Sequence, residues 1–192
     1  MKIGVLASQG AFAEHISVLH RLKVEAVPVR LSRELEGLDG LIIPGGESTS
    51  MGRLMLDYNL MSEIKALARD GLPVFGTCAG MILLAKKVSG SYPEPLGIMD
   101  ITVRRNAFGR QRESFETELM VPVLGEELFP GVFIRAPAIE QVNGKADVLA
   151  RLADGTGVAA RQGKLLASAF HPELTDDLRF HRYFLDVVAG SQ

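Results

Sequence analysis

The chain has 192 residues, of which 47% are hydrophobic and 23% are charged, and its formal net charge is −2. This length suits one domain with a large buried core, so we expect a single domain that spans residues 1–192. The small net charge argues against a protein that binds nucleic acid or an anionic membrane.

The first half of the chain alternates short apolar runs with helical patterns. Strands are expected at residues 2–7, 24–30, 40–44 and 73–76. The expected helices cover residues 11–22, one long segment from Ser50 to about Ala68 with its cap among residues 48–50, and residues 81–88. Strands and helices in alternation predict a parallel, doubly wound sheet.

The second half changes to short strand-like runs, which cover residues 101–105, 116–123, 131–137, 147–152, 157–162 and 165–170. Asp154-Gly155 and Gln162-Gly163 stand where tight hairpins need them, and a final helix is expected over residues 176–190. These runs are expected to add antiparallel strands to the sheet or beside it. The sequence thus predicts a three-layer α/β/α fold of the flavodoxin-like type, mostly parallel, with added antiparallel strands.

Cys78, the only cysteine, lies in the pattern Gly76-Thr77-Cys78-Ala79-Gly80 between an expected strand and an expected helix. This is the context of a nucleophile elbow, where flanking glycines let strand and helix pass closely around a strained turn. The helix amides help to hold the thiol as a thiolate, and an amide next to Cys78 can face a developing oxyanion. The alternative is a small buried side chain, because free cysteine is often buried.

The chain has four histidines, and one of them lies beside a carboxylate at the end of a strand. His171 follows the run that ends at residue 170, in His171-Pro172-Glu173. Proline favours an extended backbone before it, so His171 and Glu173 should project together, as in a catalytic triad. His15, His20 and His181 lie within expected helices and are interpreted as structural or solvated.

A glycine-rich loop, residues 44–49 (PGGEST), leads into the amino end of a helix and can offer amides to an anion. Phosphate is the rival ligand to an oxyanion or carboxylate, but the loop lacks the lysine of a P-loop. One cysteine and four scattered histidines form no metal-ligand cluster, so no metal site is expected.

A single cysteine cannot form an internal disulfide, which indicates a reducing compartment. The first residues, MKIGVLASQG, bring polar residues too early for a signal peptide, and no apolar run approaches the roughly 18 residues that span a bilayer. We therefore expect a cytoplasmic protein.

With these motifs placed, almost the whole chain resembles the class I, triad-type glutamine amidotransferases. Within that family it is similar to the glutaminase subunits of pyridoxal 5′-phosphate (vitamin B6) synthases, on the motifs PGGESTSM, RNAFGRQ (105–111) and GVFIRAP (131–137). The resemblance implies hydrolysis of L-glutamine to L-glutamate and ammonia, and no cofactor. It also implies a large hetero-oligomer with a barrel-shaped synthase subunit, arranged as a double hexameric ring. That subunit makes pyridoxal 5′-phosphate from ribose 5-phosphate and glyceraldehyde 3-phosphate.

The resemblance also implies roles for individual residues. Cys78 would be the nucleophile, His171 the general base and acid, and Glu173 the group that orients His171. The other implied assignments are an oxyanion hole at Gly46 and Ala79, glutamine contacts at Gly46, Glu47, Ser48, Arg105, Ile134 and Arg135, and a partner-facing segment at Gln9 and Gly10. Ser8 and Arg104 depart from the residues usual in the family, and neither belongs to the triad.

Two other functions are compatible with the same motifs. One is a stand-alone cysteine hydrolase of the same fold, such as a γ-glutamyl hydrolase or a peptidase. The other is a regulatory domain that only binds a small anion at the PGGEST loop, although such a binder would have no need for Cys78, His171 and Glu173 together.

Overall fold

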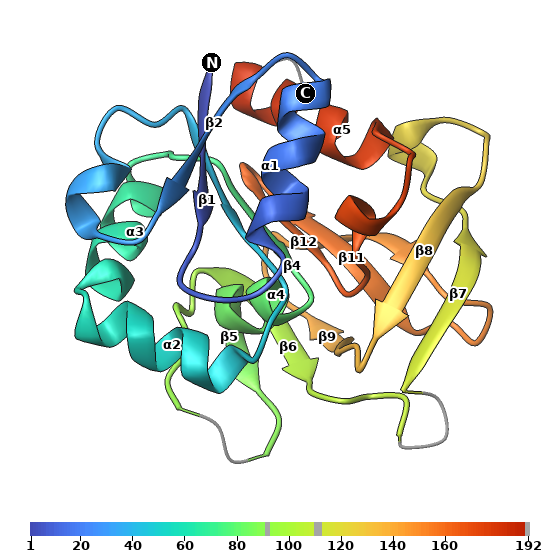
Figure 1. The fold of residues 1–192 in the computed structure, drawn as a ribbon. Helices are drawn as coiled ribbons and strands as arrows, with labels where there is room; N and C mark the ends of the chain where they lie inside the picture. Colours follow the sequence, from blue (N-terminus) through green and yellow to red (C-terminus); the bar gives the residue numbers. More distant parts are fainter. Residues whose placement is uncertain (91–92, 110–112, 191–192) are drawn as a thin grey trace.

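The computed structural model describes residues 1–90, 93–109 and 113–190 (Figure 1). Within these residues the main element is a ten-stranded sheet in the order β2-β1-β3-β4-β12-β11-β9-β6-β5, with β10 paired to β11, and a two-stranded sheet of β7 and β8 lies apart from it. The strands are β1 (Lys2–Leu6), β2 (Glu25–Val29), β3 (Gly40–Ile43), β4 (Val74–Thr77), β5 (Ala85–Val88), β6 (Met99–Arg104), β7 (Ser114–Leu119), β8 (Phe129–Ile134), β9 (Ala138–Val142), β10 (Asp147–Arg151), β11 (Gly157–Gln162) and β12 (Leu165–Ser168). The helices are α1 (Phe12–Arg21), α2 (Ser48–Asp57), α3 (Leu60–Arg69), α4 (Ala79–Leu84) and α5 (Arg179–Ala189), and 3-10 turns include η1 (Ser32–Leu35), η3 (Pro122–Leu124) and η4 (Pro172–Leu174).

Successive residues of β4 show which helices cover each face of the sheet. The ring of Phe75 packs against Phe180 and Phe184 of α5, with centroids 5.5 Å apart in both pairs. A side chain on Gly76 would instead run into Gly80 of α4. Thr77 returns to the first face, where its hydroxyl lies 3.2 Å from His15 of α1. Because side chains alternate between faces, α1 and α5 cover one face and α4 covers the other, with α2 packed on α4. The three-layer arrangement is confirmed.

The centre of the sheet is parallel and its far side is mixed. Strands β2, β1, β3, β4 and β12 pair in parallel, and β11 then pairs antiparallel with β12. Beyond it β9 and β6 continue antiparallel, while β5 runs parallel to β6. The hairpins expected at Asp154-Gly155 and Gln162-Gly163 join β10 to β11 and β11 to β12, with both glycines at positive φ. The added antiparallel strands are therefore confirmed.

Three predicted helices are wrong in their extent. The long helix from Ser50 is two helices, because Asn59 has a left-handed backbone (φ 58°) that interrupts the turn between α2 and α3. The helix expected over residues 81–88 covers Ala79–Leu84 only. Residues 85–88 form β5 instead, because they pair with β6, and this pairing overrides the local helical pattern. The final helix begins at Arg179, later than residue 176.

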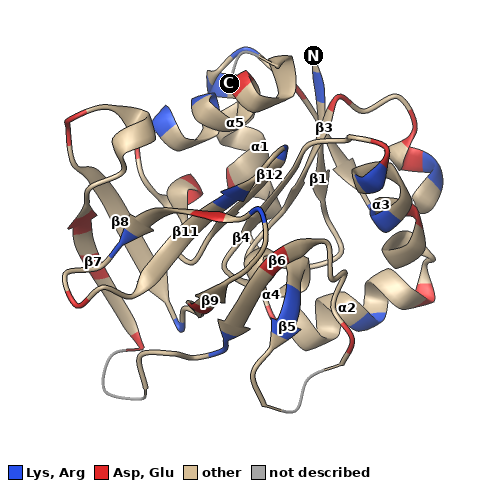
Figure 2. Cartoon of the chain, turned by 180° about the vertical axis from the view of Figure 1, so that it is seen from behind, with Lys and Arg blue, Asp and Glu red and all other residues tan. Residues whose placement is uncertain are grey.

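The core is continuous around the central strands, and β3, β4 and β12 carry no Lys, Arg, Asp or Glu (Figure 2). No helix within the described ranges is both long and apolar enough to cross a lipid bilayer. The same ranges contain no group of three or more His, Cys, Asp or Glu side chains that could hold a metal ion. The sequence motif RNAFGRQ ends at Arg110 and Gln111, which lie outside the described residues.

Candidate active site

Cys78 lies in a strained turn between β4 and α4. Its backbone has φ 50° and ψ −102°, a combination that costs free energy for any residue with a side chain. The turn is held by the Cys78 N–H, which donates to the Ser168 carbonyl at 2.7 Å, and by the Ile82 N–H, which donates to the Cys78 carbonyl at 3.3 Å. The Cys78 side chain is only 7% exposed, and its sulfur lies 3.8 Å from the Ile134 carbonyl oxygen.

The two glycines around Cys78 are required by close packing. A Cβ atom on Gly76 would lie 2.5 Å from the Gly80 carbonyl carbon, and a Cβ on Gly80 would lie 2.0 Å from the Ile43 carbonyl oxygen. Both contacts are with backbone, which cannot move aside as a flexible side chain does. The Gly-x-Cys-x-Gly pattern therefore lets α4 approach β3 and β4 closely enough to form the elbow.

His171 and Glu173 meet, though not through the extended backbone used in the sequence argument. Residues 172–174 form the 3-10 turn η4, and this turn brings a Glu173 carboxylate oxygen to 2.7 Å from His171 Nδ1. The other ring nitrogen of His171 is thereby left for Cys78, with which its side chain also forms a hydrogen bond. Burial lowers the pKa of His171, but the bonds to Cys78 and Glu173 outweigh it and raise the pKa to about 10. This arrangement favours the charged, imidazolium form of His171 beside Cys78.

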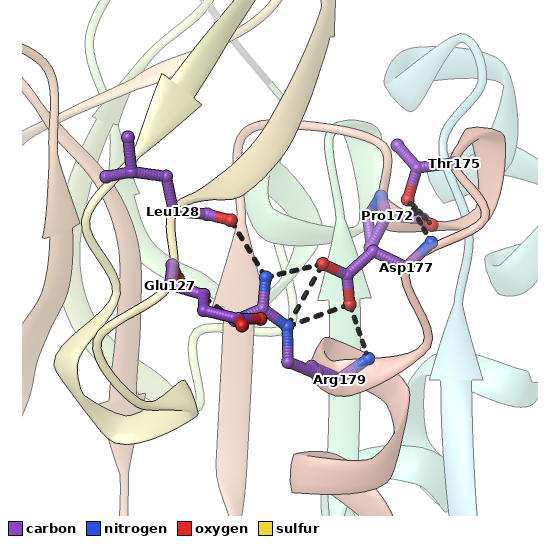
Figure 3. Close-up of polar contacts among 6 residues, drawn as sticks. All are labelled: Glu127, Leu128, Pro172, Thr175, Asp177 and Arg179. Atoms are coloured by element: carbon purple, nitrogen blue, oxygen red, sulfur yellow. Dashed lines mark hydrogen bonds and ion pairs between the residues drawn. The ribbon is translucent and has the colours of Figure 1, made fainter.

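A polar cluster ties the chain after this turn to the loop before β8 (Figure 3). The Arg179 guanidinium pairs with both carboxylate oxygens of Asp177 and donates to the main-chain carbonyls of Glu127 and Leu128 at 2.9 and 2.8 Å. The Asp177 N–H in turn donates to the Thr175 hydroxyl. Because these bonds join residues 175–179 to residues 127–128, they fix the path of the chain between η4 and α5.

The glycine-rich loop lies directly over the cysteine and the histidine. A Cβ on Gly45 would lie 2.4 Å from the His171 ring and 3.4 Å from Cys78 Cβ, so only glycine leaves room here. The Gly45 carbonyl accepts a hydrogen bond from the Ala11 N–H at 3.2 Å, and Gly10 packs against it with φ 86°. Because the carbonyl and N–H of a trans peptide point in opposite directions, the Gly46 N–H points away from Ala11.

A cavity of about 320 Å³ opens above Cys78 and His171, and it is lined by every residue assigned from the sequence to glutamine: Gly46, Glu47, Ser48, Arg105, Ile134 and Arg135. Ala79 and Gly10 also line it. Gln9 is exposed but is not part of the lining, and Glu173 lies behind His171, 6% exposed. The Ser48 hydroxyl is buried and has no hydrogen-bond partner among the described residues.

Glu47 differs from the other lining residues because its carboxylate already accepts hydrogen bonds and forms an ion pair within the protein. It caps α2 by accepting hydrogen bonds from the Thr49 N–H and from the N–H and hydroxyl of Ser50, and it pairs with Arg105 at 3.4 Å. The Ser50 hydroxyl, followed by the capping amides, lowers the pKa of Glu47 to about 2. The carboxylate therefore stays charged and holds Arg105 at the rim of the cavity.

The sequence argument missed His15, which is fully buried against Glu173. A signal was present, because His15 lies on the same helical stripe as Phe12 and Leu19, three residues before it and four after it. His181 is also fully buried, whereas His20 is exposed. The prediction that these histidines are structural or solvated stated nothing about which of them approaches the site.

The family of the chain follows from comparison with known proteins. The sequence model of the SNO glutamine amidotransferase family matches residues 5–189. The chain therefore belongs to this family. Two similar curated proteins are both named pyridoxal 5′-phosphate synthase subunit PdxT. The one from Moorella thermoacetica is 58% identical over 188 residues, 98% of this chain and 100% of that protein. The one from Pelotomaculum thermopropionicum is 59% identical over 186 residues, 97% of this chain and 94% of that protein.

Solved structures agree with this assignment. A crystal structure titled as a glutamine amidotransferase superposes with a TM-score of 0.92 at 52% identity, covering 97% of this chain and 98% of the other. The structure of PurLQS from Thermotoga maritima is only 15% identical, with a TM-score of 0.70 over 96% of this chain and 97% of that one, and it supports the fold alone.

Proposed function

We propose that this chain is the glutaminase subunit of a pyridoxal 5′-phosphate synthase and that Cys78, His171 and Glu173 hydrolyse L-glutamine in the cavity above them. The observation that carries the assignment is the contact chain itself. Cys78, on a strained elbow, contacts one side of the His171 ring, and the buried Glu173 holds the other side at 2.7 Å. This is the arrangement of nucleophile, base and orienting acid that acyl transfer requires.

The reaction proceeds in two steps. The Cys78 thiolate attacks the side-chain carbonyl carbon of glutamine, and a tetrahedral oxyanion forms. His171 donates its proton to the leaving nitrogen, so that ammonia departs and a glutamyl thioester remains on Cys78. His171 then takes a proton from water, which attacks the thioester, and glutamate leaves as the thiol re-forms.

The remaining lining residues bind the substrate and the oxyanion. The N–H groups of Gly46 and Ala79 stabilise the oxyanion. Arg105 and Arg135 bind the α-carboxylate, supported by the main chain of Gly46, Glu47 and Ile134. Ser48 offers a buried hydroxyl that has no other bond among the described residues, which supports its assignment as a polar contact to glutamine.

The ammonia passes to the synthase subunit that docks on the face around Gln9 and Gly10. This segment is exposed, and it packs against the Gly45–Gly46 peptide through Gly10 and the Ala11 N–H. A partner that moves residues 9–11 therefore changes the orientation of that peptide and of the Gly46 N–H. We expect the isolated chain to be nearly inactive, because the partner selects the competent loop state.

The test is the steady-state rate of glutamine hydrolysis by wild type and by Cys78→Ala, each with and without the synthase subunit. Wild type should be strongly activated by the synthase. Cys78→Ala should show no turnover in either condition while its thermal unfolding midpoint stays near that of wild type. Normal turnover by Cys78→Ala would overturn the nucleophile assignment. A fully active wild-type chain that ignores the synthase would instead favour the stand-alone hydrolase.

A further inference from the structure

A chain of buried polar side chains continues behind Glu173, away from the cavity. His171 uses only one carboxylate oxygen of Glu173, and the second lies 3.4 Å from His15 Nε2. His15 Nε2 is also 3.2 Å from the Thr77 hydroxyl, and His15 Nδ1 is 2.9 Å from His181 Nε2. The Glu173 and His15 side chains are both fully buried, so none of these groups can turn to water instead.

The contacts decide which ring nitrogens carry protons. The second Glu173 oxygen accepts no hydrogen bond from the described residues, although His15 Nε2 lies at ion-pair distance from it, and a buried carboxylate oxygen without a donor is costly. A proton on His15 Nε2 faces both this oxygen and the Thr77 hydroxyl, and it makes His15 Nδ1 an acceptor for the His181 Nε2–H. The remaining nitrogen, His181 Nδ1, is then a bare acceptor, which agrees with its lack of a partner among the same residues.

Burial keeps both of these histidines neutral. It lowers the pKa of His15, although Glu173 opposes the shift, and it lowers the pKa of His181 to about 3, with His15 acting in the same direction. Neutral rings with one proton each point their N–H groups in one direction, from His181 to His15 and from His15 toward Glu173.

We propose that His15 is a positioning residue for glutamine hydrolysis: it donates its Nε2–H to the second oxygen of Glu173 and so fixes the carboxylate that orients His171. This inference rests on the proposed function. The support is geometric, because α1 packs against η4 and holds the His15 ring rigidly against the 3-10 turn that carries Glu173. His15 does not line the cavity, so it acts on the rate of the chemical steps and not on glutamine binding.

Loss of this bond changes the pH dependence in a defined direction. The charged or titratable groups that face Glu173 are His171 on its own segment and His15 on α1, with His181 of α5, Glu14 of α1 and Cys78 beyond them. Burial raises the pKa of Glu173, but the charge of His15 in its protonated form, and the hydrogen bond and charge of His171, outweigh it and lower the pKa. A neutral N–H beside a carboxylate also favours the charged carboxylate, so removing His15 lets Glu173 protonate at higher pH, and a protonated Glu173 no longer supports the charged His171. The acid limb of the kcat profile should therefore move to higher pH.

The experiment compares three substitutions of His15 in the complex with the synthase subunit. His15→Leu removes every donor, His15→Gln places an amide N–H near the Nε2 position, and His15→Asn places it near the Nδ1 position. We expect kcat to fall about 10- to 100-fold in the Leu and Asn variants, the range found when outer partners that orient histidines at metal sites are removed. The Gln variant should keep kcat within about fivefold of wild type, and KM for glutamine should change less than about twofold in all three.

His20→Leu, an exposed position on the same helix, is the matched control and should match wild type in kcat and pH profile. If His15→Leu does not fold, the Gln and Asn variants decide alone, because both are amides that differ only in where the donor lies. Equal kcat for Gln and Asn, or an unmoved acid limb in a folded Leu or Asn variant, overturns the inference. If wild type itself hydrolyses no glutamine with the synthase present, it is the proposed function that fails.

Discussion

Two walls of the cavity follow different strands, and one of these strands, β8, belongs to the small second sheet. The catalytic wall, Cys78, His171 and Glu173, follows β4 and β12, which are adjacent parallel strands whose last residues, Thr77 and Ser168, are in register. The substrate wall, Arg105, Ile134 and Arg135, follows β6 and ends β8, outside the parallel centre. Ile134 is 37% exposed, whereas His171 and Glu173 are each 6% exposed.

The difference shows how one site separates chemistry from recognition. Parallel strands bring their carboxyl ends to the same edge of a sheet, so the reacting groups are held by the core of the protein. The substrate wall depends on chain segments with positive φ at Arg135 and Asn106, and both of these residues are exposed. Changes in the catalytic wall should therefore alter kcat or folding, and changes in the substrate wall should alter KM.

The largest effect is expected at His171. His171→Asn should lower kcat by about 10⁴-fold or more, because it removes the base that is hydrogen-bonded to Cys78, and Glu173→Gln should cost about 10- to 100-fold less. Both rates are measured with the synthase subunit, and circular dichroism checks that the variants fold. Equal losses in the two variants would mean that Glu173 takes part in proton transfer itself.

The packing of the elbow should be visible in stability. Gly80→Ala places a Cβ 2.0 Å from the Ile43 carbonyl oxygen, and it should lower the free energy of unfolding by about 2–3 kcal/mol. Gly52→Ala is the matched control, because this glycine is also helical and its nearest neighbour, a Leu83 methyl, lies at 3.5 Å. That variant should be stabilised by about 0.5–1 kcal/mol. Urea denaturation measures both, and similar values would show that the elbow can relax around a side chain.

The substrate wall should respond through KM. Arg105→Ala and Arg135→Ala should each raise KM for glutamine about 10- to 100-fold with kcat changed only a few fold, since each removes a charged hydrogen bond to the substrate. Arg104→Ala removes an exposed arginine that pairs with Glu140 at 3.6 Å, and it should leave KM unchanged. If Arg135→Ala lowered kcat and left KM unchanged, the assignment of substrate binding to this wall and of chemistry to the other would be wrong.

The smallest effect concerns pH and stability. The pKa of His171 is raised to about 10, so the stabilisation from its charged form is complete below its unfolded pKa, about 6.5, and is lost as pH rises toward 10. The free energy of unfolding should fall between pH 7 and 10 more steeply in wild type than in His171→Asn. Arg135→Ala, in the substrate wall, should keep the wild-type slope. Parallel curves for wild type and His171→Asn would show that His171 is not charged in the folded protein.

Several features of the fold and the site were open to prediction because their signals are local. Strand–helix alternation, the glycines around Cys78 and the short spacing from His171 to Glu173 each depend on residues close together in the sequence. The His171–Glu173 contact was anticipated for a different backbone, because both an extended segment and a 3-10 turn can bring these two side chains together.

Other features depended on contacts between distant segments. The break between α2 and α3 at Asn59 could not be predicted, because the helical spacing of apolar residues continues across it. This spacing does not indicate that one residue has a left-handed backbone. Residues 85–88 became β5 because they pair with β6, which local propensity cannot anticipate.

The sequence by itself determined which residues could react, since a thiol framed by glycines and a histidine beside a carboxylate are written in two short motifs. Only the tertiary structure decided what surrounds them: the loop of Gly45 over the Cys78–His171 pair, and His15 behind Glu173. The physical reason is that the neighbours of a buried polar group are set by packing between distant segments, and the nitrogen that lies 3.4 Å from the second Glu173 oxygen comes from α1, at the other end of the chain.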